Sequence, residues 1–184
     1  SLTLGSGAAG GDTQLLTTVG SLQASLAGAG KLTVSQTGTL AGATLSTTDG
    51  DITLTSSGAV QANIVVAGGA NRRVQLTAAS GDLTAGTVDA GSAGRIELAA
   101  TAGTVNGAAA ALTAASLGLS SGVGIGSVAT PFVTDIAQVD AQVTGSGGIY
   151  LSSPTALTLA TARTRYATDR RITSPRAASP TSRP

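Results

Sequence analysis

Apolar and polar residues alternate in short runs that recur at a nearly constant interval. The recurring unit is an aliphatic residue, one other residue and a second aliphatic residue, and successive units begin 20, 22, 22 and 21 residues apart. The pairs are Leu32/Val34, Ile52/Leu54, Val74/Leu76, Ile96/Leu98 and Leu117/Leu119. A period of two is typical of strands with one buried face. The pattern therefore predicts that the second members point into a core and that Thr53, Gln75 and Glu97 point out.

Two further apolar sites complete each repeat. A Gly-x-aliphatic step follows at Leu40, Val60, Leu83 and Val105, and a third aliphatic site follows at Leu45, at Ile64 or Val66, at Val88 and at Leu112. Glycine and Asp-Gly steps between the runs supply tight turns. Three short strands in about 21 residues make one coil of a solenoid, and the leucine-rich repeat, a rival of similar period, lacks its signature here. The sequence predicts an all-β, right-handed parallel β-helix (β-solenoid) with about 20–22 residues per coil over residues 1–162.

The repeat breaks after Leu117, because the next strong pair begins 32 residues later at Ile149. We expect an insertion at about 120–148, which contains the only phenylalanine of the chain. Proline cannot donate to a sheet ladder, so this segment is expected to bulge from the solenoid. The predicted interaction loop consists of Pro131, Phe132, Val133 and Asp135. The alternative is a tolerated loop whose phenylalanine packs back on the shaft.

Residues 163–184 form a second break, with six arginines, three prolines and no aliphatic periodicity. This composition predicts an irregular basic tail without helix or strand. We expect it either to be solvated or to cross into a neighbouring subunit. The predicted inter-subunit contacts are Arg163, Arg165, Tyr166, Arg170 and Arg171.

The residue before each repeat pair forms a ladder of charged or polar side chains on the outer surface: Lys31, Asp51, Arg73, Arg95 and Ser116. We interpret the ladder as an exposed series of charges that helps to set register, each pair contributing ~0–1 kcal/mol. The alternative is an anion site at Arg73 and Arg95.

Composition limits the chemistry that such a scaffold could perform. The chain has no histidine or cysteine, ten basic and nine acidic residues, and a net charge of +1. Histidine-based and thiol-based catalysis, disulfides, histidine-type metal sites and zinc knuckles are therefore excluded. We expect no catalytic, metal-binding or cofactor-binding residues. A single tyrosine in the basic segment gives no stacking platform for nucleic acid, and no apolar run reaches the ~20 residues of a bilayer span.

The segments from Gly50 to Val60 and from Gly94 to Val105 resemble the shaft repeats of filamentous haemagglutinin-type adhesins, which are exported by two-partner secretion. The resemblance covers roughly residues 10–160, and no binding or catalytic residue carries over from it. The family's Asn-Pro-Asn type secretion motifs are absent from this sequence. The resemblance implies a bacterial protein that is secreted or held at the cell surface.

These observations lead to two expectations of function. The first is a structural rod segment of an adhesin or extracellular filament, either a piece of a longer solenoid or a protomer that forms a homo-polymer through head-to-tail contacts of its ends. The second is a β-helix module that presents the 120–148 segment to a receptor or glycan. An enzyme is not expected, because acids, bases and nucleophiles are few.

Overall fold

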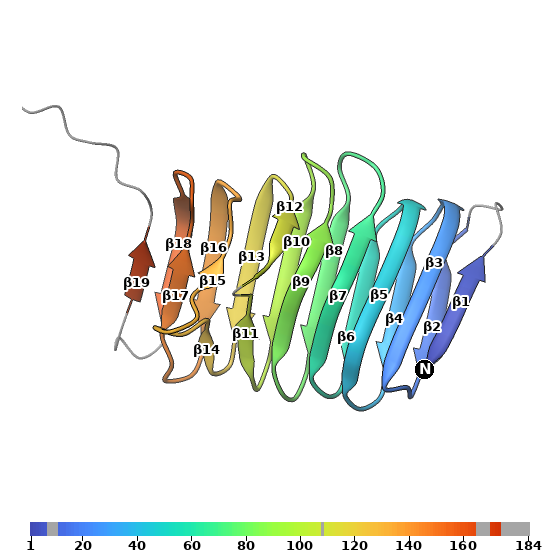
Figure 1. The fold of residues 1–184 in the computed structure, drawn as a ribbon, viewed down its shortest axis with the longest axis horizontal. Coiled ribbons are helices and arrows are strands. Elements are labelled where there is room, and N and C mark those ends of the chain that lie inside the picture. The colour runs from blue at the N-terminus through green and yellow to red at the C-terminus, as the bar shows by residue number, and fades with distance from the viewer. Residues whose placement is uncertain (7–10, 108, 165–169, 174–184) are drawn as a thin grey trace, which may run out of the picture.

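The computed structural model describes residues 1–6, 11–107, 109–164 and 170–173 (Figure 1). These residues form two parallel β-sheets that stack as a solenoid of about 7 turns, with no helix among them. The predicted parallel β-solenoid is therefore confirmed. Since the described part of the chain is built of strands and loops, it contains no helix that could cross a membrane.

Each coil contributes strands to an eight-stranded and to an eleven-stranded sheet. The eight-stranded sheet contains β2 (Thr13–Thr17), β4 (Leu32–Gln36), β6 (Ile52–Ser56), β8 (Arg73–Ala78), β10 (Arg95–Ala100), β13 (Ser116–Ser121), β16 (Gln138–Val143) and β18 (Thr158–Thr164). The eleven-stranded sheet contains β1 (Leu2–Ser6), β3 (Ser21–Ala29), β5 (Leu40–Asp49), β7 (Val60–Ala67), β9 (Leu83–Asp89), β11 (Thr104–Asn106), β12 (Ala111–Thr113), β14 (Gly124–Ile125), β15 (Phe132–Val133), β17 (Ile149–Ser152) and β19 (Arg170–Thr173).

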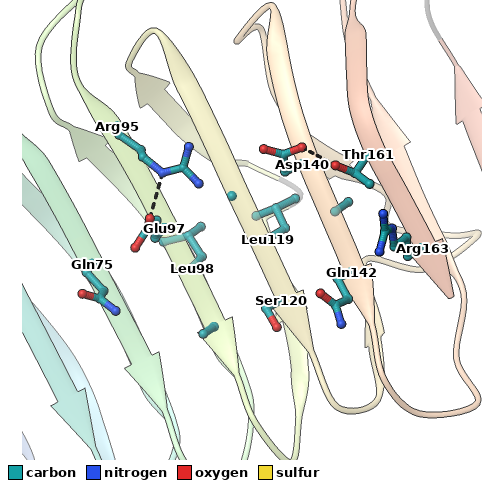
Figure 2. A pocket seen from close by; sticks show the side chains of 13 residues that line it. Gln75, Arg95, Glu97, Leu98, Leu119, Ser120, Asp140, Gln142, Thr161 and Arg163 are labelled. Atoms are coloured by element: carbon teal, nitrogen blue, oxygen red, sulfur yellow. Dashed lines mark hydrogen bonds and ion pairs between the residues drawn. The ribbon is translucent and has the colours of Figure 1, made fainter. Parts of the chain in front are cut away.

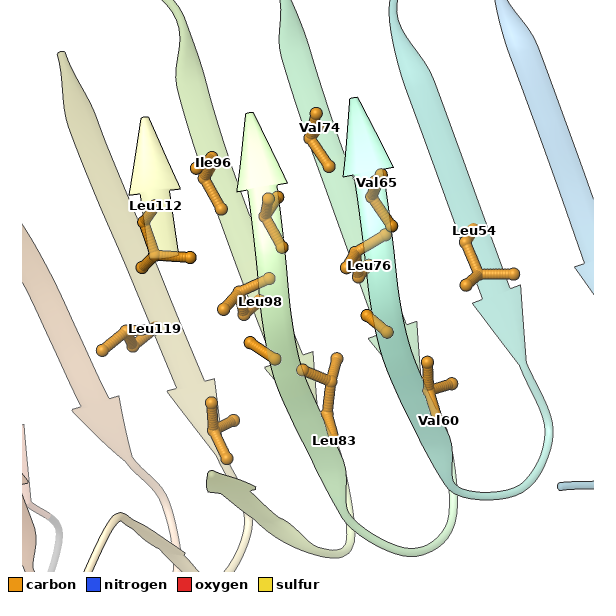
Figure 3. Packing of buried hydrophobic residues seen from close by; sticks show 14 of the residues in the cluster. Leu54, Val60, Val65, Val74, Leu76, Leu83, Ile96, Leu98, Leu112 and Leu119 are labelled. Carbon is orange, nitrogen blue, oxygen red and sulfur yellow. The ribbon is translucent and has the colours of Figure 1, made fainter. Parts of the chain in front are cut away.

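The apolar pairs of the sequence stack in register along the eight-stranded sheet. Leu54, Leu76 and Leu98 are register partners on three successive strands, and each is buried. Their side chains face those of the eleven-stranded sheet across a thin core (Figure 3). Gln75 and Glu97 lie on the opposite face and stay partly exposed. The predicted inward and outward positions are confirmed.

The 32-residue step in the sequence proves to join positions on two different sheets. Val139 is the register partner of Leu117 and lies 22 residues after it, which preserves the period of the repeat. Ile149 belongs to β17 of the other sheet, where it pairs with Ile125. The expected insertion at 120–148 is thus a coil of ordinary length, in which loop residues flank the two-residue strands β14 and β15. The pattern is hard to recognise because an alanine, Ala141, replaces the second aliphatic residue.

In three successive coils the second and third predicted strands form one continuous strand, namely β5, β7 and β9, whereas β11 and β12 stay separate in the next coil. The third core position is held by Leu45, Val65, Val88 and Leu112, which are in register. The sequence pattern pointed to Ile64 or Val66 in place of Val65, yet Ile64 is 48% exposed. A register shift between β5 and β7 places the extra residue Asn63 between Ala62 and Ile64. One extra residue reverses which side chains face the core.

Glycine is required where successive coils meet at their corners. A Cβ atom built on Gly50 would lie 1.7 Å from the carbonyl oxygen of Gly30, one coil earlier. Gly81 has a φ of +99°, a conformation that residues with a side chain rarely adopt. Buried hydroxyls complete these corners: Ser56 Oγ donates to the carbonyl of Gly38 at 2.6 Å, and Ser121 Oγ donates to that of Gly103 at 2.7 Å.

The basic segment at 163–184 contains more strand than its composition predicts. Strand β18 continues to Thr164, and β19 (Arg170–Thr173) pairs in parallel with β17. The segment is therefore strand at residues 163–164 and 170–173, and its other residues, 165–169 and 174–184, lie outside the described part of the chain. Backbone pairing to a neighbouring strand does not depend on aliphatic periodicity, so a strand can form here without that pattern.

Candidate functional site: a polar groove on the eight-stranded sheet

A groove of about 420 Å³ crosses the outer face of the eight-stranded sheet. It is lined by side chains from β8, β10, β13, β16 and β18 (Figure 2). Those with polar ends are Gln75, Arg95, Glu97, Ser120, Asp140, Gln142, Thr161 and Arg163. The lining also includes Leu98, Ala99, Leu119 and Ala141, and more of it is apolar than polar. The groove thus combines charged and polar side-chain ends from five neighbouring strands with apolar surface between them.

The groove exists because a glycine interrupts a ladder of larger side chains. Gly118 lies in register between Glu97 on β10 and Asp140 on β16, and its strand neighbours Leu117 and Leu119 point into the core. With no side chain at 118, the surface drops to the level of the backbone. Two residues further along the same strands, the outward positions are Ala99 on β10 and Ser120 on β13, whose small side chains also leave the surface close to the backbone.

Glu97 anchors one side of the groove. Its carboxylate accepts hydrogen bonds from Nε of Arg73 at 3.2 Å, from Nη2 of Arg73, and from Nε of Arg95 at 2.7 Å. Burial opposes ionisation of Glu97, but the hydrogen bonds and positive charges of the two arginines outweigh it and hold its pKa below the ordinary value. Glu97 is therefore ionised at neutral pH.

Arg95 extends from this cluster across the glycine gap. Figure 2 shows its guanidinium pointing toward β13, and Asp140 lies on the far side of that strand. A Cβ atom at Gly118 would lie 3.4 Å from Nη2 of Arg95. On the far side, Asp140 Oδ1 accepts a hydrogen bond from Thr161 Oγ1 at 2.6 Å, and Arg163 is exposed at the end of the groove.

In the ladder of charged residues predicted from the sequence, Arg73 and Arg95 form ion pairs, but with Glu97 and not with Asp51. Arg73 and Arg95 are register partners, as the anion-site alternative required, but the carboxylate of Glu97 bonds to both. Asp51 does not pair with a neighbouring cation side chain in any described contact; it accepts a hydrogen bond from the backbone N–H of Arg73 at 2.9 Å. Asp12 and Asp82 accept from backbone amides one coil on in the same way.

The predicted interaction loop lies elsewhere, on the eleven-stranded sheet. Phe132 is completely buried, and β15 pairs with β17. Pro131 and Val133 are half-buried, whereas Asp135 is exposed. A second groove of about 410 Å³ lies between β12 and the segment containing Val133 and Asp135. The structure therefore places Phe132 in the core and leaves Asp135 as the exposed member of the group.

The five residues predicted to make inter-subunit contacts fall in three different parts of the chain. Arg163 lines the polar groove, and Arg170 and Arg171 belong to β19. Arg165 and Tyr166 lie outside the described residues. Within the described ranges, no three Asp, Glu, His or Cys side chains converge to hold a metal ion.

The sequence did not predict the polar groove, although its alternation placed Gln75 and Glu97 at successive outward positions. Gly118 and Asp140 continue that ladder, but Asp140 lies within the expected insertion at 120–148, and the 22-residue step from Leu117 to Val139 was not recognised. Comparison with protein-family models, with curated proteins and with solved structures gives no match for this chain.

Proposed function

We propose that the chain is a structural rod segment of a secreted or cell-surface bacterial adhesin or extracellular filament, that it catalyses no reaction, and that it joins other copies end to end. The observation that supports this proposal is the unbroken register of the eight-stranded sheet from β2 to β16. Backbone hydrogen bonds and stacked apolar side chains then follow one axis, as a stiff rod requires. The likeness of the repeats to haemagglutinin shafts supports a location outside the cell.

The strands of the first coil support the end-to-end contact. Among the described residues, β1 and β2 each pair on one side, with β3 and β4. The free edge of a parallel strand is a template for a further strand. A second copy, or a further stretch of the same polypeptide, can therefore add a coil at this end.

Light scattering and electron microscopy of the purified chain test the assembly. We expect the mass to rise with concentration and rods longer than one chain to form. Leu15→Lys places an inward-pointing charge on the edge strand β2, where Leu15 packs partly against the core, and should weaken this association. Leu16→Lys is the matched control, because Leu16 is 77% exposed on the same strand.

A mass that stays at one chain over the whole concentration range contradicts end-to-end assembly. An equal effect of the two lysine variants would show that added charge, and not a blocked edge, reduces the association. Labelling of intact source cells with an antibody against the chain tests the proposed location; signal only after lysis would contradict it.

The burial of Phe132 favours the rod over the alternative in which the 120–148 segment is presented to a receptor or glycan. A recognition loop would present its largest apolar side chain, and here that side chain is fully enclosed. The ring lies where a Cβ atom at Gly107 would come within 2.4 Å of it, so the glycine makes room for the phenylalanine. These contacts support a packing role for the segment.

A further inference from the structure

We infer that the groove around Gly118 is a binding site for a neutral, polyhydroxylated ligand, that is, an oligosaccharide or polysaccharide segment lying along the axis of the rod. This ligand site is additional to the structural role proposed above. It also lies on the sheet opposite the predicted interaction loop at 131–135.

The walls of the groove offer hydrogen-bond donors and acceptors in alternation. Acceptors are the carboxylates of Glu97 and Asp140, and donors are the guanidinium groups of Arg95 and Arg163. Gln142 supplies both kinds from its amide. A hydroxyl group is at once a donor and an acceptor, so a row of hydroxyls can satisfy such a mixed surface.

The charges of the groove argue against a simple anion. The strongest cationic point, between Arg73 and Arg95, is already filled by the carboxylate of Glu97. Asp140 adds a second negative charge beside the gap. An anionic ligand would have to approach both carboxylates, and like charges at short range are repulsive.

A bare cation fits no better. Glu97 and Asp140 are separated by the whole of β13, and no third acidic side chain joins them within the described residues. The guanidinium of Arg95 also lies over the space between them (Figure 2). Calcium needs six or more converging oxygens. A neutral ligand is the class that the surface suits.

The shape of the groove indicates an elongated ligand. Its lining spans five adjacent strands, which at the ordinary strand separation cover about 19 Å. The groove runs over outward positions of the sheet, which alternate with the buried core positions of the same strands. A chain of several sugar units laid across the strands would reach from Gln75 to Arg163.

Gly118 allows the groove to be filled without disturbing the fold. The same ladder holds Gln75 two strands away, so Gly118→Gln introduces a side chain that this sheet already accommodates. The new Cβ atom would make only ordinary contacts, at 3.4 Å or more. Thr53→Gln is the matched control, since Thr53 occupies the same ladder on β6, outside the groove.

Affinity electrophoresis of the full chain tests the inference. The gels contain galactomannan, xyloglucan or dextran as neutral polysaccharides, and polygalacturonate or heparin as acidic ones. We expect at least one neutral polysaccharide to retard the protein. Gly118→Gln should weaken this retardation about tenfold or more, because access to several hydrogen-bonding groups is lost. Thr53→Gln should leave it unchanged.

Asp140→Asn provides a second variant that does not fill the groove. It removes one charged acceptor while keeping the size of the side chain, and should weaken the same retardation severalfold. Thermal unfolding by circular dichroism checks that each variant keeps its fold; if Gly118→Gln unfolds, Asp140→Asn with Gln142→Ala takes its place.

Three results would overturn the inference: no retardation by any neutral polysaccharide, retardation by the acidic ones only, or equal retardation of the wild type and the groove variants. Each of these leaves the structural rod unaffected, because rod assembly is measured separately by mass and microscopy.

Discussion

Truncation of Leu76 to alanine tests the core of the solenoid directly. Leu76 is completely buried and lies in register between Leu54 and Leu98. The substitution removes three carbon groups, which at ~0.8 kcal/mol each corresponds to ~2.4 kcal/mol of lost burial. The strands above and below are held by backbone hydrogen bonds, so the cavity cannot close easily. The cavity adds to the cost, and we expect ~3–5 kcal/mol in total.

Urea unfolding followed by circular dichroism measures this change. Gln75→Ala is the control, because Gln75 precedes Leu76 on the same strand and points outward. We expect its effect to stay within about 0.5 kcal/mol. If Gln75→Ala destabilised the chain as much as Leu76→Ala, or if Leu76→Ala cost less than about 1 kcal/mol, the assigned register would be wrong.

Three further substitutions test other parts of the fold. Glu97→Gln should lower the free energy of unfolding by about 0.5–1 kcal/mol at neutral pH. The pKa of Glu97 is lowered in the folded state, so this difference from the wild type should disappear as the pH falls below 4.5. Urea unfolding at several pH values measures it. Gly50→Ala should destabilise by about 1–3 kcal/mol or more in urea unfolding, because of the contact with Gly30, whereas Gly20→Ala, with open space around it, should not. Phe132→Ala should cost about 3–5 kcal/mol if its ring is a core residue, and an unchanged unfolding midpoint would contradict that.

The sequence was sufficient to predict five strands of the eight-stranded sheet, namely β4, β6, β8, β10 and β13, because these strands keep a strict alternation. Leu32, Ile52, Val74 and Ile96 are each followed two residues later by another aliphatic residue, and no bulge disturbs their register. The period of two and the repeat length then agree with each other, which is the most informative signal that a solenoid offers.

The eleven-stranded sheet was harder to predict because its strands do not keep a strict alternation. Its long strands bend and contain register shifts, as at Asn63, and each shift exchanges the inward and outward positions beyond it. A search for alternation therefore selected Ile64 and Val66 on the wrong face. The periodicity also failed at Ala141, whose small side chain fills a core position that longer aliphatics hold on earlier coils.

The candidate groove depends on information that alternation does not contain. Outward positions are not constrained by packing, so their identities show no period, and the absence of a side chain at Gly118 is as important as the charges beside it. Recognising the groove required the register between β10, β13 and β16, which fixes which outward residues become neighbours. Once that register is known, Glu97, Gly118 and Asp140 follow in order.

The separation of inward and outward positions explains how one thin coil can serve two purposes. On β13, Leu117 and Leu119 are buried and continue the stacked core, while Gly118 between them contributes nothing to it. Glycine in a strand interior is ordinarily unfavourable, since it packs no side chain and loses more entropy on folding. Gly118 is also free of the steric demand found at the corner glycines, because a Cβ atom there would meet no atom closer than 3.4 Å. A residue that neither packing nor backbone geometry requires is best explained by the open surface that it creates, and that surface is the polar groove.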